Sequence, residues 1–530
     1  MTTSRVLVVG WDGADWRILD PLLERGAVPN LAALIDRGGR TVLRSTLPTH
    51  SWTAWPSFLT GVDPAEHGVF DILDGRGGSK QFPVTYRSIK ERTFLEDLSR
   101  AGVETLSVNV PLTFPPPEIT GKVVAGGVLP KWRAFTHPDT LAADLEKANA
   151  PWPINGMSWT TYRNRPEAFL EEVRAVTSAR QRGMEHLLDT TDWQVATLVY
   201  FSTDRVQHCL AKYVSPDHPE YAELSTTALG EQIRDVYRML DDGLGRLLER
   251  ARSDDLVVFM SDHGFHACTG AIHLDRLLDR LGYLRFAASN AIFGPMQWGP
   301  VRAAARKVYD KLGLHGRVSL PQAVDWSKTR AYTSIRSTGE GISVNLAGRE
   351  PHGIVDPGDF ERVRNEVAER VSEFVDPRTG ERPVARVWLR EEVFKGRFAD
   401  NAPDLLLEPA PLYSLTHAKT VVEPADWLSG DHRVEGVLAA AGPGVDAAEV
   451  AGRPANLVDL APTILAAAGA QPSVRHSGTV LTQLVGADAT LAMAAASGGQ
   501  PSESAPVTPG LDDAEAEEVE EHLRGLGYLE

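Results

Sequence analysis

The chain has 530 residues, of which 42% are hydrophobic and 24% are charged, and its formal net charge is −17 at pH 7. These proportions are those of an ordinary globular protein, and they exclude a disordered, fibrous or membrane-embedded chain. The negative charge excludes a nucleic acid polymer or an anionic membrane as a broad electrostatic partner, although a local basic pocket can still hold one phosphate.

The first predicted elements alternate between strand and helix. Residues 5–10 form a short β-branched run closed by Gly10, which predicts a buried strand, and residues 22–38 have the spacing of an amphipathic helix. Further strands are predicted at 105–110, 194–202 and 256–260, a long helix at 224–252, and a core helix at 456–468. This alternation predicts an α/β fold with a doubly wound, mostly parallel central sheet and helices on both faces. The apolar run Val6–Val9 is too short for a signal peptide core, so a cytoplasmic location is expected.

The pattern changes between residues 270 and 424, where basic helical stretches (300–312), turns and alternating strands (341–346) replace the α/β repeat. We interpret this segment as an inserted α+β cap. The expected organisation is a catalytic core at 1–269 and 425–490, the cap at 270–424, a linker at 491–510 and an acidic C-terminal helix at 511–530. The linker is rich in Ser, Pro, Gly and Ala.

The C-terminal helix has one apolar face, because Val519, Leu523 and Leu526 follow each other at i, i+4 and i+7. An apolar helix face of this kind is normally buried against another protein surface. Docking on a second copy of the chain would give a homodimer, and docking on the core of the same chain is the alternative.

Polar side chains capable of binding metal lie beside four of the predicted strands. They are Asp12 after 6–9, Asp204 and His208 after 194–202, Asp262 and His263 after 256–260, and His432 before the strand at 434–441. In a doubly wound sheet, ligands gather at the carboxyl ends of the strands. Each residue alone also suits a helix cap, a solvated helical face or a loop. Since the chain has only two cysteines, a metal centre must use His and carboxylate ligands, and sets of three are typical of hydrolytic zinc or manganese sites.

Five blocks of the sequence resemble the motif series of the type I phosphodiesterase/nucleotide pyrophosphatase family, in the alkaline phosphatase superfamily. The blocks, in the family's order, are Val8–Gly13, Thr60–Gly68, Thr203–His208, Ser261–Gly264 and Gly430–Arg433. The resemblance implies an alkaline phosphatase-like fold and metal-dependent hydrolysis of a small-molecule phosphate ester, with a phosphodiester or nucleotide pyrophosphate bond as the expected target. It also implies two divalent metal ions, with zinc expected and manganese fitting the same ligands.

Transferred by matching motifs, the resemblance implies a distinct role for each site residue. One metal is assigned to Asp204, His208 and His432, and the other to Asp12, Asp262, His263 and the nucleophile oxygen. Counting back from Thr60 places Ser51 at the nucleophile position, with Thr49 and Thr53 as alternatives. Ser51 would attack phosphorus to form a phosphoseryl enzyme, which water then hydrolyses. The helix expected to begin near Trp52 would direct backbone N–H groups at the phosphate.

The sequence departs from the family pattern after Asp71, where Ile72 replaces a frequent Asn that contacts phosphate. The motif therefore does not assign the residue that contacts phosphate. Asn109 at another strand end is the candidate we name first, and Lys131 and Arg133 are further ones; each also suits a turn or a surface position.

Three other functions remain compatible with parts of this pattern. A phosphomonoesterase or a phosphotransferase would use the same core, and a catalytically silent scaffold would retain the fold while using the cap and acidic tail for binding. A sulfatase is not supported, because neither Cys209 nor Cys268 begins a Cys-x-Pro-x-Arg motif.

Overall fold

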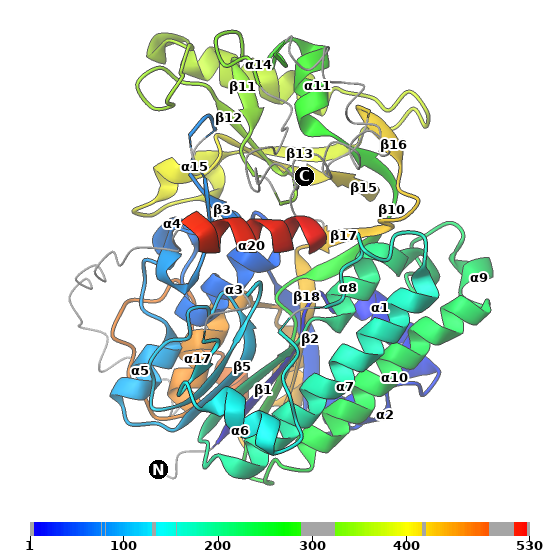
Figure 1. The fold of residues 1–530 in the computed structure, drawn as a ribbon, viewed down its shortest axis with the longest axis vertical. Coiled ribbons are helices and arrows are strands. Elements are labelled where there is room, and N and C mark those ends of the chain that lie inside the picture. The colour runs from blue at the N-terminus through cyan, green and yellow to red at the C-terminus, as the bar shows by residue number, and fades with distance from the viewer. Residues whose placement is uncertain are drawn as a thin grey trace, which may run out of the picture.

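The structure is a computed structural model that describes residues 5–75, 77–79, 81–129, 134–154, 156–287, 324–335, 337–415, 420–486 and 513–526. The candidates Lys131 and Arg133, the predicted helical stretch 300–312 and the predicted linker 491–510 lie outside the described residues. Figure 1 shows a large lower body built around one sheet, a smaller upper body, and the C-terminal helix across their junction.

The central sheet has nine strands in the order β19-β2-β18-β9-β1-β8-β5-β6-β7. Their bounds are β1 (Val6–Trp11), β2 (Gly39–Arg44), β5 (Thr105–Pro111), β6 (Gly121–Gly126), β7 (Thr136–His137), β8 (Val195–Tyr200), β9 (Leu256–Met260), β18 (Glu435–Ala441) and β19 (Ala455–Asn456). Strand β1 pairs in parallel with β8 and β9, and β5 pairs in parallel with β6 and β8. Strands β18 and β7 run antiparallel to their neighbours. The predicted mostly parallel α/β sheet is confirmed.

Helices cover both faces of this sheet (Figure 1). One group contains α1 (Trp16–Glu24), α2 (Pro29–Arg37), α7 (Pro166–Thr190), α8 (Ser202–Leu210) and α10 (Ala228–Leu248), and the other contains α3 (Ser51–Thr60), α5 (Phe94–Arg100) and α17 (Leu460–Ala467). Strand β1 is buried along its whole length, as expected for a strand covered on both faces. The shorter helices are α4 (Pro64–His67), α6 (Leu141–Lys147), α9 (Tyr221–Leu224), α16 (Ala447–Gly452) and α18 (Thr482–Val485).

The predicted single helix at 22–38 is wrong, because the structure has two helices there. Helix α1 ends at Glu24, and Gly26 then adopts a φ of 65°, a left-handed conformation that favours glycine. Pro29 occupies the first turn of α2, where its missing N–H costs no hydrogen bond. The apolar spacing continued across the break, so periodicity alone missed it.

The upper body has a hydrophobic cluster of its own, contributed by residues between Ile272 and Val422. Its four-stranded sheet has the order β11-β12-β14-β13, with β11 (Ala331–Thr333), β12 (Gly341–Val344), β13 (Val384–Leu389) and β14 (Leu405–Pro409). Its helices are α11 (Leu274–Leu281), α14 (Phe360–Ser372) and α15 (Arg390–Val393). A further small sheet joins β10 (Gly264–Ile272) with β15 (Leu412–Leu415), β16 (Val422–Pro424) and β17 (Gly430–Arg433), and β3 (Leu73–Asp74) pairs with β4 (Phe82–Pro83). We refer to the upper body as the cap.

The C-terminal helix α20 (Asp513–Leu526) packs on the chain that carries it. Val519 and Leu523 are buried in the main hydrophobic cluster, whereas the side chain of Leu526 lies outside the described residues. The apolar face is therefore covered within one chain, and the homodimer stays an untested prediction. Among the described helices, none has the length and apolar character needed to cross a membrane.

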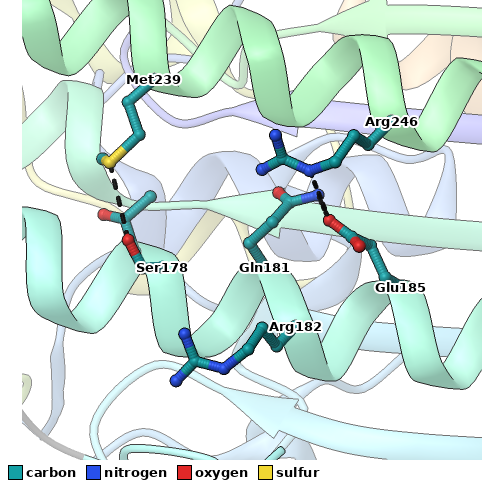
Figure 2. A pocket seen from close by; sticks show the side chains of 7 residues that line it. Ser178, Gln181, Arg182, Glu185, Met239 and Arg246 are labelled. Atoms are coloured by element: carbon teal, nitrogen blue, oxygen red, sulfur yellow. Dashed lines mark hydrogen bonds and ion pairs between the residues drawn. The ribbon is translucent and has the colours of Figure 1, made fainter.

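A hollow of about 240 Å³ lies between α7 and α10 in the outer helical layer. Figure 2 shows Ser178, Gln181 and Glu185 reaching toward Met239 and Arg246, with an ion pair of 2.7 Å between Arg246 Nε and Glu185 Oε1. None of the predicted site residues lines this hollow.

Candidate active site

The predicted metal ligands come together at the carboxyl edge of the central sheet. Asp12 follows β1, Asp204 and His208 lie on α8 after β8, Asp262 and His263 follow β9, and His432 lies in β17. All six side chains are buried or nearly so, and Ser51 begins the neighbouring helix α3. Residues far apart in the sequence thus meet because parallel strands end at one edge.

The first ligand group consists of Asp204, His208 and His432. Asp204 Oδ1 lies 3.2 Å from His208 Nε2 and 3.4 Å from His432 Nε2, and the two ring nitrogens are 3.0 Å apart. His432 Nδ1 donates a hydrogen bond of 3.0 Å to the Thr49 carbonyl, which can only accept, so Nε2 of the neutral ring offers a lone pair. Three donor atoms therefore converge on one point, as a metal ion requires.

The second group surrounds Ser51. Its Oγ lies 3.3 Å from Asp12 Oδ1 and 3.2 Å from His263 Nε2. His263 Nε2 is also 3.3 Å from Asp262 Oδ2, while His263 Nδ1 donates to the Gly264 carbonyl over 3.0 Å. Asp12, Asp204 and His263 lie close enough to share an ion, so Asp204 faces both groups.

The buried carboxylates of this cluster favour the binding of divalent cations. Burial, reinforced by the charges of Asp262 and Asp204, raises the pKa of Asp12 well above its usual value, and burial raises the pKa of Asp262 to about 8. Asp204 Oδ1 and Asp262 Oδ2 are buried and accept no hydrogen bond from the described residues. Buried carboxylates need a compensating charge, and metal ions held by these Asp and His side chains would supply it.

The structure distinguishes Ser51 from its two neighbours. Thr49 Oγ1 donates to the Thr46 carbonyl over 3.1 Å, and Thr53 Oγ1 hydrogen-bonds His50 Nε2 over 3.0 Å. Only Ser51, among these three, directs its hydroxyl at Asp12 and His263. It also occupies the first position of α3, where the helix dipole favours a phosphate.

Residues 6–435 match the family described as type I phosphodiesterase / nucleotide pyrophosphatase. The chain belongs to this family. The family expected from the sequence is therefore confirmed, and it makes the protein a metal-dependent phosphoester hydrolase rather than a silent scaffold. No curated protein matches the chain.

Two solved structures illustrate the fold of this phosphodiesterase family member. Murine ectonucleotide pyrophosphatase / phosphodiesterase 5, inactive and in complex with AMP, is 14% identical with a TM-score of 0.51, covering 90% of this chain and 97% of that one. Phosphonoacetate hydrolase from Sinorhizobium meliloti 1021, in complex with phosphonoformate, is 16% identical with a TM-score of 0.54, covering 88% of this chain and 96% of that one. At such identities the likeness concerns the fold, which is that of the alkaline phosphatase superfamily.

Several neighbours hold the phosphodiesterase site in shape. Trp55 Nε1 donates to Asp12 Oδ2 over 3.0 Å, and the Gly13 N–H donates to Asp262 Oδ1 over 3.2 Å. His67 Nε2 hydrogen-bonds Ser57 Oγ on α3 over 2.8 Å, which agrees with its motif position beside the nucleophile helix. These bonds fix the direction of the carboxylates and of α3.

The cap contributes two residues that the sequence did not reveal. Glu340 Oε2 accepts a hydrogen bond of 3.0 Å from the backbone N–H of Thr49, two residues before Ser51. Ser337 Oγ donates to Asp71 Oδ1 over 2.6 Å. Neither residue lies in one of the five family-like blocks. Glu340 directly precedes the strand predicted at 341–346, but that position gives no sign of a bond to a residue 291 positions away.

Asn109 does not belong to the metal-ligand cluster in this structure. Its Nδ2 donates a hydrogen bond of 2.7 Å to the Val199 carbonyl, and its backbone has a φ of 62°, which Asn tolerates better than most residues. The side chain therefore ties β5 to β8. A contact between Asn109 and phosphate stays a prediction.

Proposed function

We propose that this enzyme hydrolyses a phosphodiester or nucleotide pyrophosphate bond in a small-molecule ester, through a phosphoseryl intermediate on Ser51 and with two divalent metal ions. The observation that carries the proposal is the position of Ser51 Oγ, 3.3 Å from Asp12 and 3.2 Å from His263 at the start of α3. A hydroxyl in this place has potential metal ligands on one side and a helix N-terminus on the other.

Each part of the site has a distinct task in this proposal. Asp204, His208 and His432 would hold one ion. Asp12 and His263 would hold the other, with Asp204 within reach of the same point and Asp262 beside His263 as the further ligand we expect. When bound, the ions supply positive charge that stabilises the attacking, leaving and non-bridging oxygens of phosphoryl transfer. Zinc is the metal we expect, and manganese suits the same ligands.

The chain's own groups account for the covalent steps. The Ser51 Oγ–phosphorus bond forms while the bond from phosphorus to one ester oxygen breaks on the opposite side, and that oxygen leaves with the hydroxyl proton. Water then attacks phosphorus, the Ser51 Oγ–phosphorus bond breaks, and Oγ regains a proton from that water. Trp55 holds Asp12 through its Oδ2, and Asp12 Oδ1 in turn accepts the Ser51 hydroxyl.

The related structures agree with a small phosphorus-containing ligand. One neighbour was solved with AMP and the other with phosphonoformate. A phosphomonoesterase or a phosphotransferase built on the same core is the alternative, because the ligand groups serve all three reactions. A cytoplasmic location stays a prediction.

The deciding experiment compares methyl p-nitrophenyl phosphate, a diester whose second substituent is small, with the monoester p-nitrophenyl phosphate, with zinc or manganese added. Metal-dependent turnover that favours the diester, and that Ser51→Ala abolishes, is the expected result. Ser178→Ala is the matched control, because Ser178 lies in the outer helical layer between α7 and α10 (Figure 2) and should be neutral.

Each other outcome has a definite meaning. A preference for the monoester would replace the diesterase assignment with a phosphatase. Unchanged turnover in Ser51→Ala would mean that the nucleophile is a different residue. Trapping of a peptide in which residue 51 carries the phosphoryl group together with the retained ester substituent, detected by mass spectrometry after acid quenching, would support the intermediate directly.

A further inference from the structure

Helix α20 inserts a side chain into an apolar cavity beside the nucleophile helix. Val519 of α20 and Trp52, which directly follows Ser51, both line this cavity. The other lining residues are Val84, Thr85, Leu112, Phe114, Gly126 and Val128. Since Leu112 and Gly126 lie at the carboxyl ends of β5 and β6, the cavity is at the same edge of the sheet as the metal ligands.

With Val519 in place, the cavity has almost no free space. About 10 Å³ remains, which is at the lower limit for one water molecule. An aryl or nucleoside group cannot enter such a volume. A phosphodiester substrate keeps one of its two ester substituents during the first step, and we call this substituent the ester arm. While α20 is docked, an ester arm that extends past Trp52 must therefore be small.

The apolar part of the contact between α20 and the core lies on one face of the helix. Among its described side chains, Ala516, Val519 and Leu523 provide the buried apolar face, while Glu517 and Glu521 are exposed. The helix follows residues 487–512, a segment whose sequence is rich in Ser, Pro, Gly and Ala. A tethered helix of this kind remains at a high local concentration after release, so it can dock again.

From these observations we infer that α20 is a tethered plug that determines the size of the ester arm accepted beside Trp52. With the helix docked, the enzyme selects phosphodiesters whose second arm is small, and release of the helix admits aromatic arms. Val519 is the residue that sets this limit. The inference rests on the proposed phosphodiesterase function and specifies its substrate class.

The test compares two diesters that have the same leaving group and differ in the arm that is retained. The probes are methyl p-nitrophenyl phosphate and bis-p-nitrophenyl phosphate, and the readout is the ratio of their kcat/KM values in the full-length enzyme. Val519→Asp and Leu523→Asp place a charge in the apolar contact and should release α20. Each should raise the ratio in favour of the aromatic arm about 10-fold or more, the scale on which a pocket discriminates by size.

Two further measurements separate this effect from general damage. Glu517→Ala changes an exposed position of the same helix and should leave the ratio at its wild-type value. Amide hydrogen exchange over residues 513–526 should accelerate in both aspartate variants. Val519→Ala, which enlarges the cavity without adding charge, should raise the ratio to a smaller extent.

The outcomes that would overturn the inference differ from those that concern the proposed function. A ratio that stays constant although exchange over 513–526 accelerates would show that α20 does not limit the ester arm. Exchange that remains at the wild-type rate in both aspartate variants would show that these side chains do not hold the helix. Absence of turnover for either diester, in wild type and variants alike, would instead remove the phosphodiesterase assignment and the inference with it.

Discussion

The core and the cap contribute to the active site in different ways. Among the described residues, those that can bind metal or attack phosphorus come from the core, at strand ends that meet at one edge of the sheet. The cap contributes Glu340 and Ser337, which bond to Thr49 and Asp71 in the nucleophile region. The core therefore supplies the candidate metal ligands and Ser51, while the cap forms hydrogen bonds to core residues near them.

The largest loss of activity is expected for Asp204→Ala, which tests the contribution of the core. Asp204 faces both ligand groups, so its loss should weaken both metal sites together. Because metal ions supply several kcal/mol of transition-state stabilisation, we expect kcat/KM to fall by about 10³-fold or more. Metal content measured by mass spectrometry should fall as well.

Asp241→Ala is the matched control for this prediction. Asp241 is equally buried, but its carboxylate accepts the backbone N–H groups of Asn30 and Leu31 at the start of α2. Its loss should cost about 1 kcal/mol of stability, as for other helix caps, with metal content retained. Equal metal loss in both variants would mean that Asp204 acts through the fold and not as a ligand.

In the cap, the corresponding buried carboxylate is Asp404, and its removal should affect stability. Asp404 accepts hydrogen bonds of 2.6 Å from both Nη1 and Nη2 of Arg349, and one of 3.2 Å from Arg390. Asp404→Ala removes these bonds from two partly buried arginines, although Arg349 keeps Glu350 and Arg390 keeps Asp400 as ion-pair partners, so the expected cost is about 1–3 kcal/mol. Urea unfolding should show this loss, while titration with zinc should find the metal sites of the core intact. Loss of metal binding would contradict the division of tasks between core and cap.

The sequence predicted where the candidate ligands gather better than it predicted the contacts around them. Asp12, Asp204 and Asp262 were identifiable because a local signal, a strand followed by a ligand, places each of them at the sheet edge. Glu340 was not, because its bond to Thr49 joins positions 291 residues apart in the sequence, and no local pattern specifies such a contact. For α20, periodicity revealed the apolar face containing Val519 but could not show which surface covers it.

A smaller effect, on metal affinity, is expected when Arg205 is substituted. This residue lies next to the first ligand group. Arg205 Nε is 3.7 Å from Asp204 Oδ2, and its guanidinium stacks 5.0 Å from the Trp159 ring, which lies 4.7 Å from the His208 ring. Since groups behind metal ligands fix ligand orientation, Arg205→Met should weaken metal binding about 10–100-fold in isothermal titration calorimetry. Arg364→Met, which removes a buried arginine stacked on Phe360 in the cap, should leave metal affinity unchanged.

The smallest effect is expected for Glu340→Gln in the cap, and it concerns how the stability of the protein depends on pH. Burial raises the pKa of Glu340 well above its usual value, and the charge of Asp431 raises it further. The folded protein therefore keeps this proton to a higher pH than the unfolded chain. Stability from this group is complete below the unfolded pKa of about 4.3 and is lost as pH rises through the folded pKa.

Glutamine can still accept the Thr49 N–H but cannot ionise, so the variant should escape this loss. Glu340→Gln and wild type should be equally stable at acid pH, and the variant should become the more stable protein as pH rises. Urea unfolding between about pH 4 and pH 8 measures the difference, and a gap that is constant or reversed would mean that Glu340 is ionised in the fold. Because the bond to Thr49 survives, diester turnover should change little, as expected if the cap positions the nucleophile region without taking part in the reaction.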